Sequence, residues 1–79
     1  MEVIEFDLTA LFAQIHTLAI ESAESAVADL RVSPYHARRW YAAFDSACTA
    51  LCALEAARIG VPSAVFAASF AEWRSTLTA

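Results

Sequence analysis

Lysine is absent from this chain of 79 residues, glycine occurs once and proline twice. A single glycine excludes the glycine-rich loops that cradle phosphate groups, and it leaves few places for turns. The longest stretches without a charged residue, 8–20 and 59–71, are 13 residues each. A membrane-spanning helix needs roughly 18–20 apolar residues. We therefore predict no spanning segment and no membrane partner.

Positive charge is also scarce, with five arginines against nine acidic residues and a net charge of −4. Nucleic-acid backbones and anionic membranes attract positive fields, so neither is predicted as the main partner. Residues 1–7 carry acids where a secretory signal carries basic residues. These observations predict a cytoplasmic protein.

Alanine fills 19 positions, and 59% of the residues are hydrophobic. Apolar residues recur at the i, i+3, i+4 and i+7 spacing of a helix in three segments. We predict helices over about 8–31, 34–59 and 64–78, after an N-terminal tail at 1–7. Residues 1–79 then form a single helical domain.

Breaks in this pattern fix how the helices are joined. Asp7 and Ser33 stand at N-cap positions, and Pro34 suits a first helical turn. Gly60 suits a left-handed C-cap, and Ser63 is the expected N-cap of the third helix. The sequence therefore predicts an all-α, three-helix antiparallel bundle, in which two long helices form a hairpin and a shorter third helix returns along it.

The predicted third helix is about 22 Å long, against roughly 36–39 Å for the other two, so it leaves the tip of the hairpin uncovered. The predicted core consists of Phe12, Ile15, Phe44, Cys48, Leu51, Phe66, Phe70 and Trp73. The uncovered tip carries aromatic residues with arginines beside them, a combination enriched at protein interfaces. We predict a partner-binding site made of Leu30, Tyr35, Arg38, Arg39, Trp40 and Tyr41.

Small residues on the second helix, opposite its main apolar face, predict that this face is also partly buried; they are Ala42, Ala43, Ser46, Thr49, Ala50, Ala53, Ala56 and Ala57. Three short helices have more apolar surface than they can hide from water among themselves. A domain of this size also gains only about 3–5 kcal/mol from its own core. We therefore expect dimerisation to complete the bundle.

Arg38 and Arg39 lie in the first turns of the second helix, where the helix dipole disfavours cations, and Asp29 lies near the end of the first helix, where it disfavours anions. An ion pair across the hairpin would offset both costs. The alternatives are that one arginine recognises an acidic partner or a phosphate, or that both arginines are simply solvated.

Cys48 and Cys52 are four residues apart on one predicted helix, so their side chains run parallel and do not meet as a disulfide requires. With His16 they offer three soft metal ligands, but no fourth ligand is evident. We predict two buried free thiols, no metal site and no cofactor. No nucleophile, base and orienting group occur together in the pattern, so no catalytic residue is assigned and the protein is predicted not to be an enzyme.

Residues 38–44, Arg-Arg-Trp-Tyr-Ala-Ala-Phe, resemble the Arg-x-Tyr-Tyr-Ala-Ala-Phe-His helix of HEPN domains. That resemblance implies a helical nucleotide-binding or ribonuclease-toxin fold. Trp40 replaces a tyrosine of the family pattern, and Asp45 replaces its histidine. Arg31 and His36 match the spacing of the family's ribonuclease signature, but they precede the aromatic helix instead of following it, so the activity is not carried over.

Two functional hypotheses follow. The first is a small non-enzymatic regulator, adaptor or inhibitor that forms a homodimer and binds another protein; its arginine-rich, lysine-free composition is typical of a bacterial or phage genome with high GC content. The second is a nucleic-acid-binding or HEPN-like nuclease-related module that uses Arg31, His36, Arg38 and Arg39.

Overall fold

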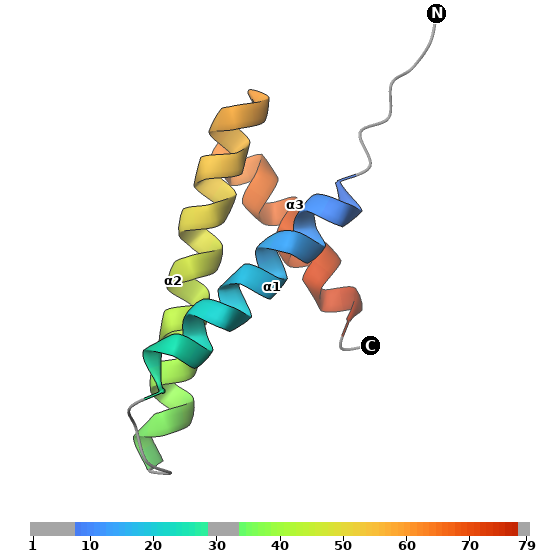
Figure 1. Cartoon of the computed structure of the whole chain (residues 1–79). Helices are drawn as coiled ribbons and strands as arrows, with labels where there is room; N and C mark the ends of the chain where they lie inside the picture. The colour runs from blue at the N-terminus through green and yellow to red at the C-terminus, as the bar shows by residue number, and fades with distance from the viewer. Residues whose placement is uncertain (1–7, 29–33, 78–79) are drawn as a thin grey trace, which may run out of the picture.

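The computed structural model describes residues 8–28 and 34–77, and this part of the chain contains three α-helices and no strand (Figure 1). Helix α1 spans Thr9–Ala26, α2 spans Pro34–Ile59 and α3 spans Ser63–Thr76. The predicted three-helix, all-α fold is confirmed, and the bounds of α2 are those predicted. Among the described residues, no helix is long and apolar enough to cross a membrane.

Helix α1 is shorter than predicted. It ends at Ala26, and the next residue, Val27, leaves the helical region with φ −109° and ψ 5°. The prediction that this helix extends to Arg31 was wrong. Val27 continues the apolar spacing of the helix and is buried in the core, but its backbone is not helical. Asp7, Asp29, Leu30, Arg31 and Ser33, on which several predictions depend, lie outside the described residues.

The junction between α2 and α3 forms around Gly60 and Pro62. Gly60 has the predicted left-handed conformation, with φ +75°, and the Val61 N–H donates to the Ala56 carbonyl at 2.9 Å. Pro62 is the N-cap of α3, with φ −56° and ψ 133°, and its carbonyl accepts the Phe66 N–H at 3.1 Å. The assignment of Ser63 as this N-cap was therefore wrong: Ser63 is already the first helical residue.

The core lies where α1 meets both other helices. The Phe12 ring of α1 contacts Phe66, Phe70 and Trp73 of α3, with ring centroids 5.4, 5.8 and 5.9 Å away. Six of the predicted core residues are buried, namely Phe12, Ile15, Phe44, Cys48, Phe66 and Phe70. Leu51 and Trp73 are partly buried and pack against this cluster.

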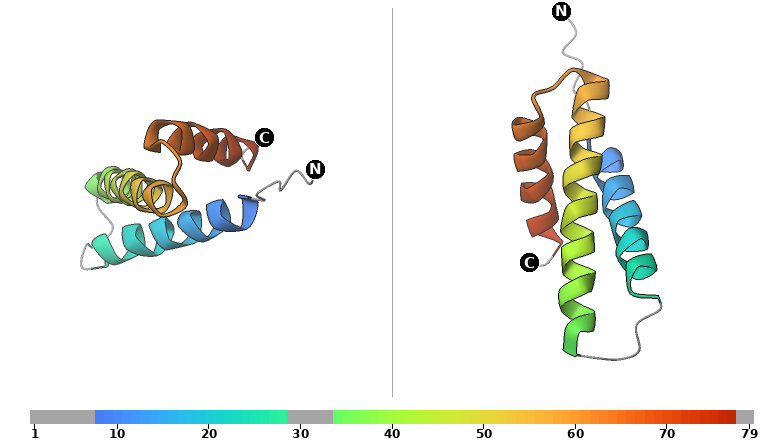
Figure 2. Two further views of the ribbon diagram at one scale, coloured as in Figure 1. Left: turned by 90° about the horizontal axis from the view of Figure 1, so that it is seen from above. Right: turned by 90° about the vertical axis from the view of Figure 1, so that its left-hand side faces the viewer.

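Helix α2 is the longest element, at about 39 Å, against about 27 Å for α1 and about 21 Å for α3. Figure 2 shows α1 and α3 on either side of α2, with part of α2 extending past both. Most of the small residues opposite the main apolar face of α2 are exposed in the single chain, contrary to the expectation of partial burial; they are Ala42, Ser46, Thr49, Ala50, Ala53 and Ala57. Ala43 is partly buried and Ala56 is fully buried.

Candidate functional site: an aromatic cleft

A cleft of about 640 Å³ opens where the C-terminal end of α3 leaves α1 and α2 uncovered. We call this site the aromatic cleft. All three helices contribute to it, and its lining residues are His16, Ile20, Trp40, Tyr41, Phe44, Asp45, Ala71, Arg74, Ser75 and Leu77. The α3 residues come from its last turns and Leu77 is its C-cap, so the length of α3 sets the position of the cleft.

Three aromatic residues of α2 form one wall of the aromatic cleft. Trp40 stacks on Phe44 with ring centroids 5.2 Å apart and an interplanar angle of 8°. Tyr41 meets the Trp40 ring edge-on, also at 5.2 Å. Phe44 is buried and Trp40 is half-buried, whereas Tyr41 is 63% exposed. Tyr41 therefore presents apolar surface to solvent beside two rings that packing holds in place.

Trp40 is anchored to α1 by a hydrogen bond. Its indole Nε1 donates to Oε1 of Glu24 at 3.2 Å. A half-buried indole usually finds an acceptor for its one N–H, and this acceptor lies on a different helix. The bond fixes how Trp40 sits between α1 and α2.

Arg74 of α3 closes the opposite side of the aromatic cleft. Its Nη1 lies 4.0 Å from Oδ1 of Asp45, and its guanidinium carbon lies 5.4 Å from the centroid of the Phe44 ring. The guanidinium thus makes a cation–π contact and a long ion pair with the same helix. Because the two charges at this rim oppose each other, they leave little net charge beside the aromatic wall.

His16 of α1 contributes a ring to the aromatic cleft rather than an ion pair. It packs edge-on against Phe44 at 5.7 Å and against Trp73 at 5.8 Å. The residue is half-buried at the boundary of the core.

A second depression, of about 410 Å³, runs between α2 and α3, and we call it the α2–α3 groove. Cys48 and Cys52 are buried free thiols in this groove, as predicted. Burial raises the pKa of both thiols, and the positive charge of nearby Arg74 partly opposes that shift. The described residues contain no group of three or more histidine, cysteine or acidic side chains arranged to hold a metal ion.

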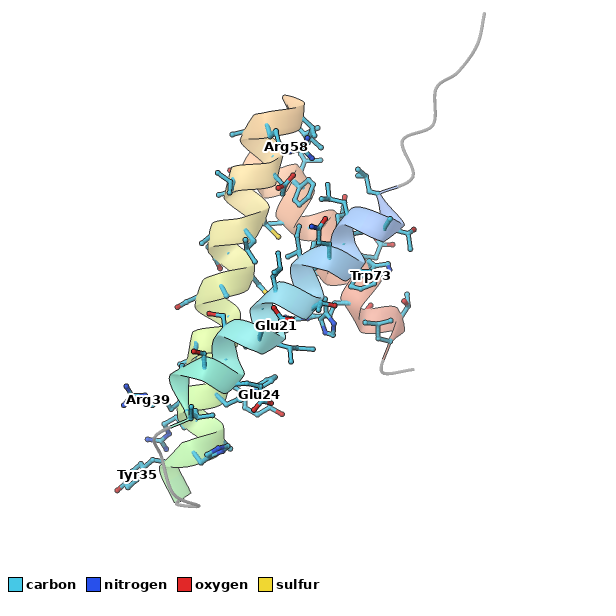
Figure 3. The ribbon with its side chains drawn as sticks, in the orientation of Figure 1. Glu21, Glu24, Tyr35, Arg39, Arg58 and Trp73 are labelled. Carbon is cyan, nitrogen blue, oxygen red and sulfur yellow. The ribbon has the colours of Figure 1, made fainter. Side chains whose placement is uncertain are left out.

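The predicted partner-binding residues do not share one face. Tyr35 and Trp40 are five residues apart, which separates them by about 140° around a helix. In Figure 3, Tyr35 and Arg39 project from one side of α2 while Glu24, the partner of Trp40, lies on the other. Trp40 and Tyr41 therefore belong to the aromatic cleft, whereas Tyr35 and Arg39 lie on the outer side of α2.

The predicted ion pair from Asp29 falls outside the described residues. Arg38 and Arg39 are exposed, and no carboxylate within the described ranges pairs with either of them. His36 is half-buried, and Arg31, its counterpart in the nuclease hypothesis, is not among the described residues.

Of the ten residues that line the aromatic cleft, only Trp40 and Tyr41 were predicted as site residues. The other eight were missed, namely His16, Ile20, Phe44, Asp45, Ala71, Arg74, Ser75 and Leu77. Phe44 carried a usable signal, since its i, i+4 spacing from Trp40 places both rings on one face. Arg74 and Leu77 carried none, because their proximity to Trp40 depends on how α3 folds back.

Comparison with known proteins adds no relationship: no family model, curated protein or solved structure matches the chain. The resemblance of residues 38–44 to HEPN domains thus gains no support from the rest of the chain.

Proposed function

We propose that this chain is a small non-enzymatic helical protein-interaction module, a cytoplasmic regulator, adaptor or inhibitor of bacterial or phage type. In this proposal it forms a homodimer and binds another protein through the aromatic cleft. The observation that carries the proposal is the exposure of Tyr41 and Leu77, at 63% and 52%, beside the packed rings of Trp40 and Phe44.

Fixed aromatic rings favour binding because little side-chain freedom is lost when a partner covers them. Tyrosine, tryptophan and arginine are also the residues most enriched among those that dominate binding energy. Trp40 and Arg74 are already held by Glu24 and Asp45. The aromatic cleft therefore suits an apolar anchor side chain of a partner, bordered by groups that accept polar contacts at the rim.

Acid–base chemistry is a poorer fit to the same geometry. Asp45 is exposed, and its Oδ1 lies 4.0 Å from Nη1 of Arg74. The nearby His16 ring is packed between two aromatic rings. These contacts support docking in preference to catalysis.

The test compares two tyrosines of similar exposure on different faces of α2. Tyr41 is 63% exposed at the aromatic cleft, and Tyr35 is 68% exposed on the outer side. Wild type, Tyr41→Glu and Tyr35→Glu are used as bait in lysate of the native host, with quantitative mass spectrometry. We expect a protein that is retained by wild type and by Tyr35→Glu but lost with Tyr41→Glu. Equal capture by all three proteins contradicts the assignment of the cleft.

The nucleic-acid alternative rests on Arg38 and Arg39, which are exposed near the start of α2. With a net charge of −4, we expect the protein to pass through a polyanion column without retention at neutral pH. Retention that falls as salt rises, and that is lost in Arg38→Ala with Arg39→Ala, would favour the alternative.

A further inference from the structure

Helix α3 exposes an uncharged face beside the α2–α3 groove. Its exposed alanines are Ala64, Ala67, Ala68 and Ala71, and three of the four line the groove. The two segments that border the groove, 46–54 and 59–71, contain no charged residue. A solvent-facing helix normally carries lysine, glutamate or glutamine at such positions.

Charged residues lie at the two ends of this face and not within it. Asp45 and Arg74 face each other at one end, 4.0 Å apart. Glu55 and Arg58 pair at 2.7 Å toward the other end of α2. A neutral apolar centre with a charged rim is the usual anatomy of a protein interface. In a chain with net charge −4, such a centre also lets two copies meet without like charges opposing each other.

The spacing of the α3 alanines reads the same in both directions. The intervals from 64 to 67, 67 to 68 and 68 to 71 are three, one and three residues. If two α3 helices pack antiparallel around a two-fold axis between Ala67 and Ala68, Ala64 faces Ala71 of the second copy, and Ala67 and Ala68 each lie next to the same residue of the second copy. Such self-matching is what a two-fold contact requires, and small side chains allow the helix axes to approach closely.

We propose that a second copy of this chain covers the α2–α3 groove, with α3 packed antiparallel on α3 around a two-fold axis between Ala67 and Ala68. This inference rests on the homodimerisation proposed above and names its surface. A face about 21 Å long and about 20 Å wide is about 400 Å² in projection, against about 800 Å² per partner in a standard interface. The dimer should therefore be weak and dissociate in the micromolar range.

Sedimentation at several concentrations tests the surface with matched substitutions. Ala67→Glu places two like charges beside the proposed axis, whereas Ala13→Glu makes the same change at an exposed position of α1. We expect wild type and Ala13→Glu to approach twice the monomer mass as concentration rises. Ala67→Glu should remain monomeric, with the dissociation constant raised at least about 100-fold. Circular dichroism should show unchanged helicity for both variants.

Oxidative cross-linking tests the register without a destabilising charge. Position 68 lies next to the proposed axis, so mild oxidation of Ala68→Cys should yield a disulfide-linked dimer. The two copies of position 64 lie about 10 Å apart along the helix direction, so Ala64→Cys should remain uncrosslinked. Wild type, whose two thiols are buried, serves as the control. Cross-linking of Ala64→Cys in preference to Ala68→Cys overturns the register.

The outcomes separate this inference from the proposed function. If Ala67→Glu dimerises as wild type does, while Tyr41→Glu is monomeric, the dimer forms through the aromatic cleft and the present inference is wrong although self-association stands. If wild type stays monomeric at every concentration, the present inference and the proposed homodimer are both wrong. The capture experiment with Tyr41→Glu and Tyr35→Glu then still tests whether another protein binds at the aromatic cleft. If Ala67→Glu alone is monomeric, the inference holds.

Discussion

Phe44 shows how a single residue serves both the core and the site. Its buried ring stacks on Trp40, meets His16 edge-on and lies under the guanidinium of Arg74. These neighbours come from all three helices, so the ring joins the aromatic cleft to the interior. Replacing Phe44 with alanine would remove packing from the core and from the aromatic cleft at the same time.

We expect Phe44→Ala and Phe70→Ala each to lower the free energy of unfolding by about 3–5 kcal/mol, because a large buried ring leaves a cavity that the backbone cannot close. That loss is comparable to the whole stability of so small a domain. Thermal and urea unfolding followed by circular dichroism measure it. Val65→Ala, at a position that is 57% exposed, is the control and should change stability by less than about 0.5 kcal/mol. Near-unchanged melts for both phenylalanine variants would contradict the packing described.

The two buried thiols predict how stability depends on alkaline pH. Desolvation raises the pKa of Cys48 and of Cys52 above the ordinary value of 9.0. At pH values above 9.0 the unfolded chain therefore loses thiol protons that the folded chain still holds. This contribution to stability is complete below the unfolded pKa and is lost as pH rises through the folded pKa.

We accordingly expect the free energy of unfolding of wild type to fall more steeply above pH 9.0 than that of a Cys48→Ala, Cys52→Ala double variant. Urea unfolding at several pH values measures the two slopes, and comparison with the variant cancels the contributions of all groups that the two proteins share. The same thiols should react slowly with alkylating reagents at neutral pH until the chain unfolds. Parallel pH profiles for the two proteins would show that burial does not shift these thiols.

At the level of the elements, the helix ends depend on backbone geometry more than on side-chain caps. Neither α1 nor α3 has a side-chain hydrogen bond at its N-cap. The C-terminal end of α2 is closed by the left-handed Gly60 and by the bond from Val61 to Ala56. The turn that sends α3 back along α2 therefore depends on one glycine.

We expect Gly60→Ala to destabilise the protein by about 1–2 kcal/mol, because a left-handed conformation is strained for any residue with a Cβ atom. No atom lies within 4 Å of the position that a Cβ would occupy, so the cost is conformational and not steric. Gly60→Asn should cost less, since asparagine tolerates this region better. Urea midpoints of the three proteins check the order, and an alanine variant as stable as wild type would contradict it.

At the level of the whole molecule, the aromatic residues of the aromatic cleft divide into those that stabilise the monomer and those that are exposed to solvent. Trp40 is half-buried, stacked on Phe44 and bonded to Glu24. Tyr41 is its neighbour in sequence but is exposed. A charge at position 40 therefore perturbs the monomer itself, whereas a charge at position 41 perturbs mainly what binds to it.

We expect Trp40→Glu to lower the free energy of unfolding by about 2 kcal/mol or more, through lost ring packing and a carboxylate placed beside Glu24. Tyr41→Glu should change stability by less than about 0.5 kcal/mol, as is usual for surface substitutions. Thermal melts of the two variants at one concentration distinguish them. Equal and small effects would show that Trp40 is not part of the monomer's packing.

The sequence by itself determined the number of helices, the bounds of α2 and most of the core, because helical periodicity, Pro34 and Gly60 act through local geometry. It did not determine where α1 ends, since Val27 keeps the apolar spacing in a non-helical conformation. The placement of Tyr35 and Trp40 on different sides already follows from their spacing of five residues on one helix. Tertiary structure alone decided that Arg74 and Leu77, at the C-terminal end of α3, join Trp40, Tyr41 and Phe44 in one cleft. Spacing along the chain orders residues around their own helix. Which residues of separate helices meet depends on how those helices cross and where the shorter one stops.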